Sequence, residues 1–476
     1  MIETRRVLIV GGGLAGLASA SALAPRGFQV KILESRPRLG GRASSFTDAA
    51  TGQMVDACQH VTMGCCTNLA HFIKTIGIDQ FFARQPDLWF MTPDRRVSRF
   101  AADRLPAPLH LARSMARAHY LSWGDKLRIG WGMLALRQVD PHDDQPLLAW
   151  LKRNRQSRRT IERFWSVVLV SALNETIDRL GLKYARKVLV DGFQRHPQGF
   201  EVSLPTVPLG RLYGGEMTDW FARQGVVIET SAGVALIEVA NDRVTGLQRR
   251  DGQLEVADEY ISAVPWPRLL DLLPEPVAEE HSCFAQLRNL ETSPIASVHL
   301  WFDRPVLDRP HLVLVDCLGH WIFNRGETTP GEHYLQVVVS AARSASVLGN
   351  QEFIERIVKE LAELVPVTRT ATILRSRVVI EHAATFSAVP NVDRWRPTQE
   401  TPLANLTLAG DWTATGWPAT MEGAVRSGYL AAEAILRRAG RVEQIIQPDL
   451  APLAVNKKYR PANKGFLFTS RKTRRP

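Results

Sequence analysis

The stretch that decides the fold is Arg6-Val-Leu-Ile-Val10-Gly11-Gly12-Gly13-Leu14-Ala15-Gly16. Its short apolar run is typical of a buried parallel strand, and the alanine- and leucine-rich residues after it predict a helix. Between them lies GxGxxG, in which Gly11 permits a tight turn and Gly13 lets a pyrophosphate approach backbone amides. Gly16 lets the helix lie close to the strand. The motif therefore predicts a dinucleotide site at the amino end of this helix.

An acidic residue stands where a dinucleotide site of this kind needs one. A second apolar run, residues 28–33, ends at Glu34, eighteen residues after Gly16. A carboxylate there can accept hydrogen bonds from the ribose hydroxyls of an adenosine, and it disfavours a 2′-phosphate. Glu34 and the adjacent Ser35 therefore extend the predicted site.

A second glycine turn follows at once, and a third lies far downstream. The second is Gly40-Gly41-Arg42, whose fixed cation can neutralise pyrophosphate charge. Downstream, the apolar residues 406–408 lead into Ala409-Gly410-Asp411-Trp412, and Met421-Glu422-Gly423-Ala424 then opens a helix rich in small residues. A strand, an acidic turn and a helix amino terminus thus recur.

These separated motifs resemble the FAD-binding framework of the flavin amine oxidase and phytoene desaturase superfamily. The resemblance implies FAD as the cofactor, with Asp411 at the ribityl–pyrophosphate region and with Met421 and Ala424 at the flavin ring. It also implies a backbone contact near the adenine, for which Val234 is the candidate. The predicted cofactor-binding residues are Gly11, Gly13, Leu14, Ala15, Gly16, Glu34, Ser35, Gly40, Gly41, Arg42, Val234, Gly410, Asp411, Thr420, Met421, Glu422 and Ala424.

The implied fold is amine oxidase-like: an α/β protein with a discontinuous, Rossmann-like FAD-binding domain and an inserted α+β substrate domain. We assign residues 1–95, 225–285 and 400–440 to the FAD-binding domain, because short strands separated by turn residues recur there. The substrate-binding domain takes residues 96–224 and 286–399. Residues 441–476 form a basic carboxyl-terminal tail.

A narrower resemblance is carried by residues 408–428, by Asp56-Ala-Cys-Gln-His60 and by Pro205 in a Ser-Leu-Pro segment. These stretches are similar to the bacterial hydroxysqualene dehydroxylase family, although Ala57 and Cys58 stand where that family has Asn-Gly. The resemblance implies FAD-dependent reductive dehydroxylation of hydroxysqualene to squalene, which feeds hopanoid and triterpenoid synthesis.

The implied reaction needs an acid and a dry, apolar pocket. Hydroxide leaves poorly, so an acid must protonate the allylic oxygen before a hydride from reduced flavin reaches the resulting cation. We predict His60 as a catalytic residue because an imidazole can donate a proton near neutral pH. Trp412 and Trp417 are predicted to offer aromatic faces to the cation. The alternatives are a buried histidine satisfied by backbone and tryptophans that serve only structural packing.

Other functions remain open alternatives. A carotenoid desaturase of the phytoene type shares the fold and a lipid substrate but runs the flavin oxidatively. A flavin amine oxidase is disfavoured, because Thr420 stands where such enzymes place an aromatic residue before the Met-Glu-Gly-Ala turn. A non-catalytic lipid-binding flavoprotein is the remaining class. The reductant that reloads the flavin is either NAD(P)H or a protein.

The charge and the cysteine content indicate in which compartment the protein works and which partners it binds. The chain carries 59 Lys plus Arg against 48 Asp plus Glu, and eight of the eleven excess positive charges lie in residues 451–476. Such a tail is either solvated or a tether to an anionic surface. Nucleic acid is not expected, because no motif reads or stacks bases. Five cysteines without a CxxC pair fit a reduced cytosol and predict no metal site.

Residues 104–137 predict contact with a membrane surface. They mix Trp, Leu and Met with six basic residues and a single acid, Asp125. That composition suits interfacial helices that dip an apolar side into the headgroup region, and it also suits an ordinary amphipathic helix covering the core. We expect a cytoplasmic protein held peripherally at the inner face of the membrane, which would deliver a lipophilic triterpene substrate.

Overall fold

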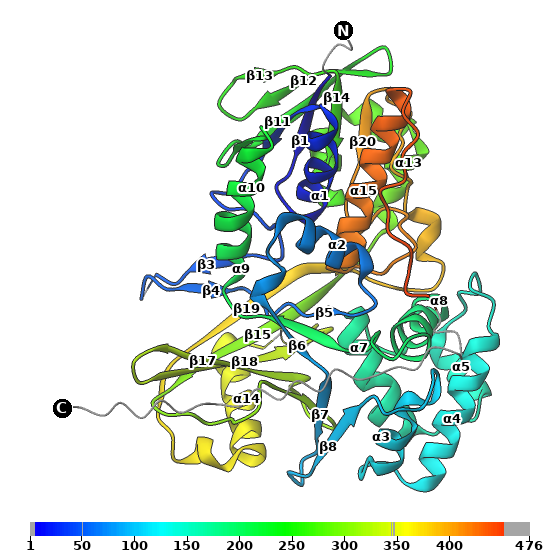
Figure 1. Cartoon of the computed structure of the whole chain (residues 1–476), viewed down its shortest axis with the longest axis vertical. Helices are drawn as coiled ribbons and strands as arrows, with labels where there is room; N and C mark the ends of the chain where they lie inside the picture. Colours follow the sequence, from blue (N-terminus) through cyan, green and yellow to red (C-terminus); the bar gives the residue numbers. More distant parts are fainter. Residues whose placement is uncertain (1–4, 50, 344, 346–347, 452–476) are drawn as a thin grey trace.

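A computed structural model describes residues 5–49, 51–343, 345 and 348–451. Its upper half in Figure 1 is built on a five-stranded sheet of order β10-β2-β1-β14-β20, in which every neighbouring pair is parallel. The strands are β1 (Arg6–Val10), β2 (Gln29–Leu33), β10 (Val227–Glu229), β14 (Glu259–Ser262) and β20 (Leu406–Leu408). The predicted Rossmann-like α/β architecture is therefore confirmed, with strands drawn from distant parts of the chain.

Helices α1 (Leu14–Leu23) and α15 (Met421–Arg438) lie side by side on this sheet (Figure 1). A Cβ atom on Gly428 would lie 2.3 Å from the carbonyl oxygen of Ala15, so only glycine permits this approach. Ser19 fastens the contact by donating to the carbonyl of Gly428 at 3.1 Å. Helix α2 (Thr67–Ile76) also packs on α15. Helices α1 and α15, which both begin near glycine motifs, are thus in close contact and joined by a hydrogen bond.

A small antiparallel sheet covers the end of the molecule near the amino terminus. It contains β11 (Val234–Ala240), β12 (Arg243–Arg249) and β13 (Leu254–Glu255). Helix α11 (Trp266–Leu272) follows β14 and packs against β11.

The lower half of the molecule is built on a seven-stranded sheet of order β19-β15-β18-β17-β16-β7-β8. Alternate residues of its strands face opposite sides. Leu335 and Val337, for example, pack beneath helix α14 (Asn350–Leu364), whereas Val338 faces a cavity. The strands are β7 (Asp87–Met91), β8 (Val97–Ala101), β15 (Thr292–Phe302), β16 (His311–Leu314), β17 (Trp321–Thr329), β18 (Glu332–Val339) and β19 (Ile373–Phe386).

Two of the predicted domain limits are wrong in detail. Strand β7, which we assigned to the FAD-binding segment 1–95, pairs with β16 in the lower sheet, because its apolar Leu88 and Phe90 line that sheet's cavity face. Conversely, residues 209–223, assigned to the substrate domain, pack with the upper sheet's core. Their apolar side chains, such as Leu212 and Phe221, join that core as the chain returns to β10.

Short strands connect the two halves. A hairpin of β3 (Ser45–Thr47) and β4 (Met54–Asp56) follows the second glycine turn. Strands β5 (Thr62–Met63), β6 (Phe82–Gln85) and β9 (Val202–Pro205) form a three-stranded sheet in the order β5-β9-β6. The segments flanking His60 are thereby held between the upper and lower sheets.

Helices complete the lower right of Figure 1. They are α3 (Ala112–Arg117), α4 (Trp123–Gln138), α5 (Leu147–Arg153), α7 (Val167–Leu173) and α8 (Leu182–Arg186), with π-helical segments η4 (Ile161–Ser166) and η5 (Lys187–Gln194). In the part of the chain that the structure describes, none of the helices combines the length and the apolar character needed to cross a bilayer.

Candidate functional site

The glycine turn after β1 forms a cradle with open space above it. Gly11 has φ +109°, and a Cβ atom on it would lie 2.8 Å from the carbonyl oxygen of Ala263. At Gly13, by contrast, the nearest heavy atom to an added Cβ is the Cα of Gly41, 3.8 Å away. No side chain among the described residues caps α1, which begins here. Its first amides are therefore available to an anion, as a bound pyrophosphate requires.

Glu34 lies beside this cradle. Its buried carboxylate accepts hydrogen bonds from the amides of Gly12 at 2.7 Å and Arg36 at 2.8 Å. These bonds hold the acid at the carboxyl end of β2, next to the turn of β1. That is the position from which a carboxylate can reach an adenosine ribose.

The second glycine turn touches the first and carries a paired cation. Gly40 (φ +96°) and Gly41 (φ +63°) adopt left-handed conformations beside Gly13. Nη2 of Arg42 donates to the carboxylate of Asp411 at 2.5 Å. Burial opposes the charge of Arg42, but the ion pair with Asp411 outweighs it and raises the pKa of the guanidinium. The residues that sequence motifs place far apart therefore meet at one edge of the cradle.

The helix amino terminus predicted at the third turn is also built as expected. Thr420 is the N-cap of α15, and its Oγ1 accepts from the amide of Gly423 at 3.0 Å. Glu422, predicted to contact the cofactor, also caps a neighbouring helix. Its two carboxylate oxygens accept from the amides of Asn68 and Leu69, at 3.2 and 2.7 Å, and so cap α2. Glu422 borders the cavity, but its charge is committed to that helix and to Arg426.

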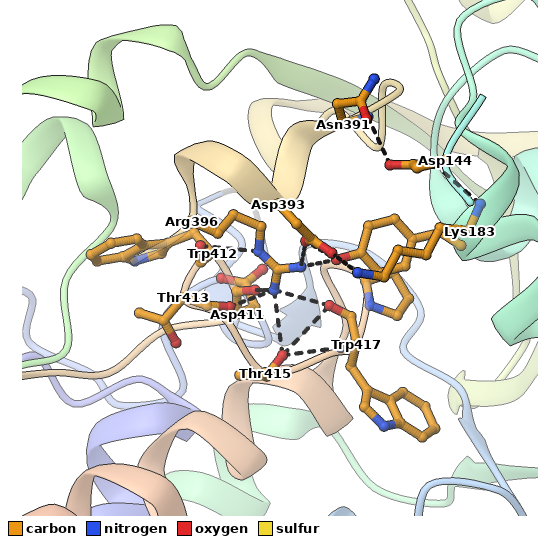
Figure 2. A network of polar contacts seen from close by, with 12 residues as sticks. Asp144, Lys183, Asn391, Asp393, Arg396, Asp411, Trp412, Thr413, Thr415 and Trp417 are labelled. Carbon is orange, nitrogen blue, oxygen red and sulfur yellow. Dashed lines mark hydrogen bonds and ion pairs between the residues drawn. The ribbon is translucent and has the colours of Figure 1, made fainter. Parts of the chain in front are cut away.

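A buried arginine holds the loop between Asp411 and Trp417 in place (Figure 2). The guanidinium of Arg396, with no exposed side-chain surface, donates to the carbonyls of Asp411 at 2.9 Å and Trp417 at 3.0 Å, and to Trp412 at 3.2 Å. Tyr184, Asp393, Thr413 and Thr415 are its remaining partners. Because a guanidinium offers five donors in a fixed fork, this one side chain fixes the loop's shape.

A cavity of about 720 Å³ runs from the cradle into the lower half of the molecule. The predicted residues that line it are Gly11, Gly13, Leu14, Ala15, Glu34, Ser35, Gly40, Gly41, Arg42, His60, Val234, Gly410, Asp411, Trp412, Trp417, Thr420, Met421, Glu422 and Ala424. Gly16 does not line it. A Cβ atom there would lie 2.1 Å from the carbonyl oxygen of Gly11, so Gly16 serves the contact between α1 and β1.

His60 lies in the cavity wall with a defined proton arrangement. Its Nδ1 lies 2.9 Å from the carbonyl oxygen of Cys58, and because a carbonyl only accepts, Nδ1 carries the hydrogen. Nε2 is then the ring nitrogen left for a substrate. Burial lowers the pKa of His60 below its usual range, so the imidazole is mostly neutral at pH 7.

The two predicted tryptophans differ in how they are held. Trp412 is 1% exposed, and its indole N–H donates to the carbonyl of Val264 at 3.0 Å, which makes it a fixed part of the wall. The ring of Trp417 lies close to two cations, Nζ of Lys187 at 4.7 Å and the guanidinium carbon of Arg426 at 4.8 Å. Its buried Nε1 has no hydrogen-bond partner among the described residues.

Sequence reasoning missed several polar residues of the cavity. Lys187 on η5, Glu381 on β19 and Asn174 at the end of α7 line the wall, and Glu381 is close enough to raise the pKa of Arg42. No spacing rule links these residues to the glycine motifs. Asn174 ends α7 in a left-handed conformation (φ +53°), a position that asparagine tolerates well. An asparagine in the sequence can therefore indicate the end of a helix, but it does not indicate that the residue borders a cavity.

The open cradle and the paired Arg42 and Asp411 at its edge fit a flavin dinucleotide. Comparisons with known proteins agree. The model of the family described as flavin containing amine oxidoreductase matches residues 14–436. The chain is 29% identical over 464 residues to the 15-cis-phytoene desaturase of an Oncidium hybrid cultivar, covering 90% of this chain and 78% of that protein. It is 27% identical to the enzyme of that name from Synechococcus elongatus, covering 92% and 97%.

Solved structures show the same fold at lower identity. Putrescine oxidase superposes with a TM-score of 0.70 at 15% identity, covering 91% of this chain and 99% of that one. Cyclohexylamine oxidase from Brevibacterium oxydans superposes with a TM-score of 0.67 at 18% identity, covering 92% and 100%. On the match over residues 14–436, the chain belongs to the flavin-containing amine oxidoreductase family and is a FAD-dependent oxidoreductase.

Proposed function

We propose that this flavoprotein converts hydroxysqualene to squalene, as a step toward hopanoids and other triterpenoids. The observation that carries the proposal is a cavity whose walls are largely hydrocarbon but which holds polar groups beside the flavin cradle. Apolar walls suit a triterpene chain, and they include Leu88, Phe90, Val167, Phe193, Val313 and Phe323. A pure hydrocarbon would form no hydrogen bond with His60 or Glu381 in that space.

The chain's own residues can serve the departure of a hydroxyl group. Bound FAD in its reduced form supplies a hydride, which replaces the hydroxyl while the oxygen leaves with an added proton as water. His60 can present Nε2 to the substrate oxygen, since Nδ1 is held by Cys58. The Cys58 contact fixes the ring, and the apolar walls exclude water that would recapture an allylic cation. A nicotinamide or a protein reductant must reload the flavin after each turnover.

Carotenoid desaturation is the second candidate, and the curated relatives favour it. Both the 15-cis-phytoene desaturases and a probable zeta-carotene desaturase of Synechococcus elongatus, 26% identical over 477 residues, match most of the chain. A desaturase takes hydride from its substrate, whereas a dehydroxylase gives hydride to it. Amine oxidation has less support, because Thr420 serves as a helix cap at the position expected for an aromatic residue.

The direction of electron flow decides between the candidates. We expect photoreduced holoprotein, incubated without oxygen with hydroxysqualene, to form squalene in step with flavin reoxidation, as measured by gas chromatography and absorbance. Oxidised holoprotein with phytoene is the matched experiment. Bleaching of the flavin by phytoene, with no squalene from hydroxysqualene, would establish the desaturase instead.

A further inference from the structure

Helix α4 presents a row of apolar side chains to solvent. Trp123, Leu127, Trp131 and Leu134 are 70%, 75%, 58% and 60% exposed. At 3.6 residues per turn they fall within about 80° of the helix circumference. The opposite face of α4 is buried in the core, so the helix is apolar on two sides. We call these four residues the α4 row; the helix lies at the lower right margin of Figure 1.

Basic residues border the α4 row. On a helical wheel Lys126 and Arg137 fall on one side of it and Arg128 on the other. Nζ of Lys126 lies 4.7 Å from the ring of Trp123. The sole acid of the helix, Asp125, is buried and paired with Arg159 at 3.2 Å. Residues 104–159 carry eleven Lys and Arg against four Asp. The row is therefore an apolar stripe in a positive field, which fits an anionic partner with an apolar interior.

The α4 row also lies behind the wall of the cavity. Nε2 of Gln194 donates to the carbonyl of Met133 on α4 at 3.3 Å. Gln194 ends the π-helical segment η5, whose Gly192 and Phe193 line the cavity. A surface bound to this helix would thus lie one layer of protein away from the substrate space.

We propose that the α4 row docks the protein on the headgroup layer of an anionic lipid bilayer, with Trp123 and Trp131 inserted at the interface. Lys126, Arg128 and Arg137 would contact lipid phosphates around them. The docking itself is independent of the reaction. Only its use, delivery of a lipid substrate to the adjoining cavity, rests on the proposed function.

Flotation with vesicles tests the docking without any substrate. Full-length holoprotein should float with vesicles of equal parts phosphatidylglycerol and phosphatidylcholine, and less with phosphatidylcholine alone. The combined Trp123→Ser, Leu127→Ser, Trp131→Ser and Leu134→Ser variant should lower binding by about tenfold or more. The matched control carries serine at four other exposed apolar positions, Leu254, Val256, Val367 and Leu374, and should bind like the parent. Flavin absorbance and melting temperature verify that both variants fold.

Three outcomes would overturn the proposal. The α4 variant could bind the anionic vesicles as well as the parent does. Binding could instead vanish only when residues 452–476 are deleted, which would assign it to the basic tail. The α4 variant could also convert a dimer to a monomer in light scattering, with no vesicle binding by the parent, which would make the row a contact between copies. Squalene formation in detergent, measured separately, tests the proposed reaction and does not depend on any of these results.

Discussion

The guanidinium of Arg42 donates to the carboxylate of Asp411 at 2.5 Å, across 369 residues of sequence. This contact joins the second glycine turn to the loop after β20, and both groups border the cavity. Arg42 also donates to the carbonyl of Ala384 at the end of β19, at 2.8 Å. One side chain therefore links the upper sheet, the lower sheet and the loop predicted to meet the flavin.

Replacing Arg42 should weaken flavin binding more than it weakens the fold. In Arg42→Met the predicted pyrophosphate site loses its cation and Asp411 keeps an uncompensated buried charge. We expect the purified protein to lose most of its yellow colour, with about 1–2 kcal/mol of destabilisation because Arg42 is partly solvated. Arg38→Met removes the same charge from an exposed position in the same turn and should stay yellow. Equal flavin content in the two variants would refute the assigned role.

Substitutions at Gly13 and Gly16 of the first glycine motif should have different effects. Gly13→Val places its side chain in open space at an extended backbone position, so the apoprotein should fold but the phosphate site is filled. Gly16→Ala forces a Cβ against the Gly11 carbonyl, and overpacking of this kind costs about 1–3 kcal/mol. Flavin absorbance with apoprotein melting temperature separates the two effects. A Gly13→Val protein that still binds flavin, and is therefore yellow, would contradict the assignment of this turn as the phosphate site.

Arg396→Lys should collapse the loop that carries Asp411 and Trp417. Lysine keeps the positive charge, but its ammonium cannot donate to all the carbonyls that accept hydrogen bonds from the guanidinium. Each buried carbonyl left without a donor destabilises the fold by about 1–3 kcal/mol. We expect a lower denaturation midpoint and weaker flavin retention, measured together. Arg394→Lys, at an exposed position two residues away, is the control and should change neither.

The proposed dehydroxylation should become faster as the pH falls. Burial depresses the pKa of His60, so at pH 7 the protonated form is scarce, and it grows as the pH drops toward that lowered value. Single-turnover rates of squalene formation measured between pH 8 and 5.5 should therefore rise toward acid. His60→Gln should flatten the profile and lower the rate by about 10²-fold or more. A His60→Gln enzyme with the parent's profile would remove His60 from the reaction.

Buried histidines should make the fold sensitive to acid. Burial lowers the pKa to about 4 for His110, His311 and His320, and to about 3 for His299. The unfolded chain binds protons near pH 6.5 while the folded chain does not, so stability is full above pH 6.5 and declines as the pH falls toward 4. Each group contributes at most about 1.4 kcal/mol per pH unit in that window.

Denaturant midpoints at pH 7 and pH 5 measure this decline. His320→Gln is the informative variant, because Nδ1 of His320 accepts the amide hydrogen of Ser340 at 2.9 Å, a bond that protonation breaks. The variant should lose less stability between the two pH values than the parent protein does. An identical loss would show that His320 is not one of the acid-sensitive groups.

Local motifs predicted the strand, the turns and the helix ends that form the cradle. The strand–turn–helix unit around Gly11 and Gly13, the acid Glu34 and the cap of α15 are each set by a few neighbouring residues, which is why their geometry is legible in the sequence. Such predictions succeed because interactions between residues close in sequence determine these elements.

The rest of the site depends on contacts between distant segments. Arg396 gives no local signal, since its partners, Tyr184 and the loop at 411–417, are fixed only by the tertiary fold. Glu381 and Lys187 reach the cavity because β19 and η5 pass along it, and no spacing in the sequence encodes that path. Strand β7 was misassigned for the same reason, because its partner β16 lies more than two hundred residues later.

The position of β20 late in the sequence determines when the nucleotide cradle can form during synthesis of the chain. This edge strand, the Asp411 loop and α15 are among the last described parts of the chain to be synthesised, yet they supply one side of the nucleotide cradle. A nascent chain that still lacks them leaves β14 with an unpaired edge and α1 without its partner helix. The nucleotide cradle is therefore complete only after these late segments have been made, and flavin capture follows their synthesis.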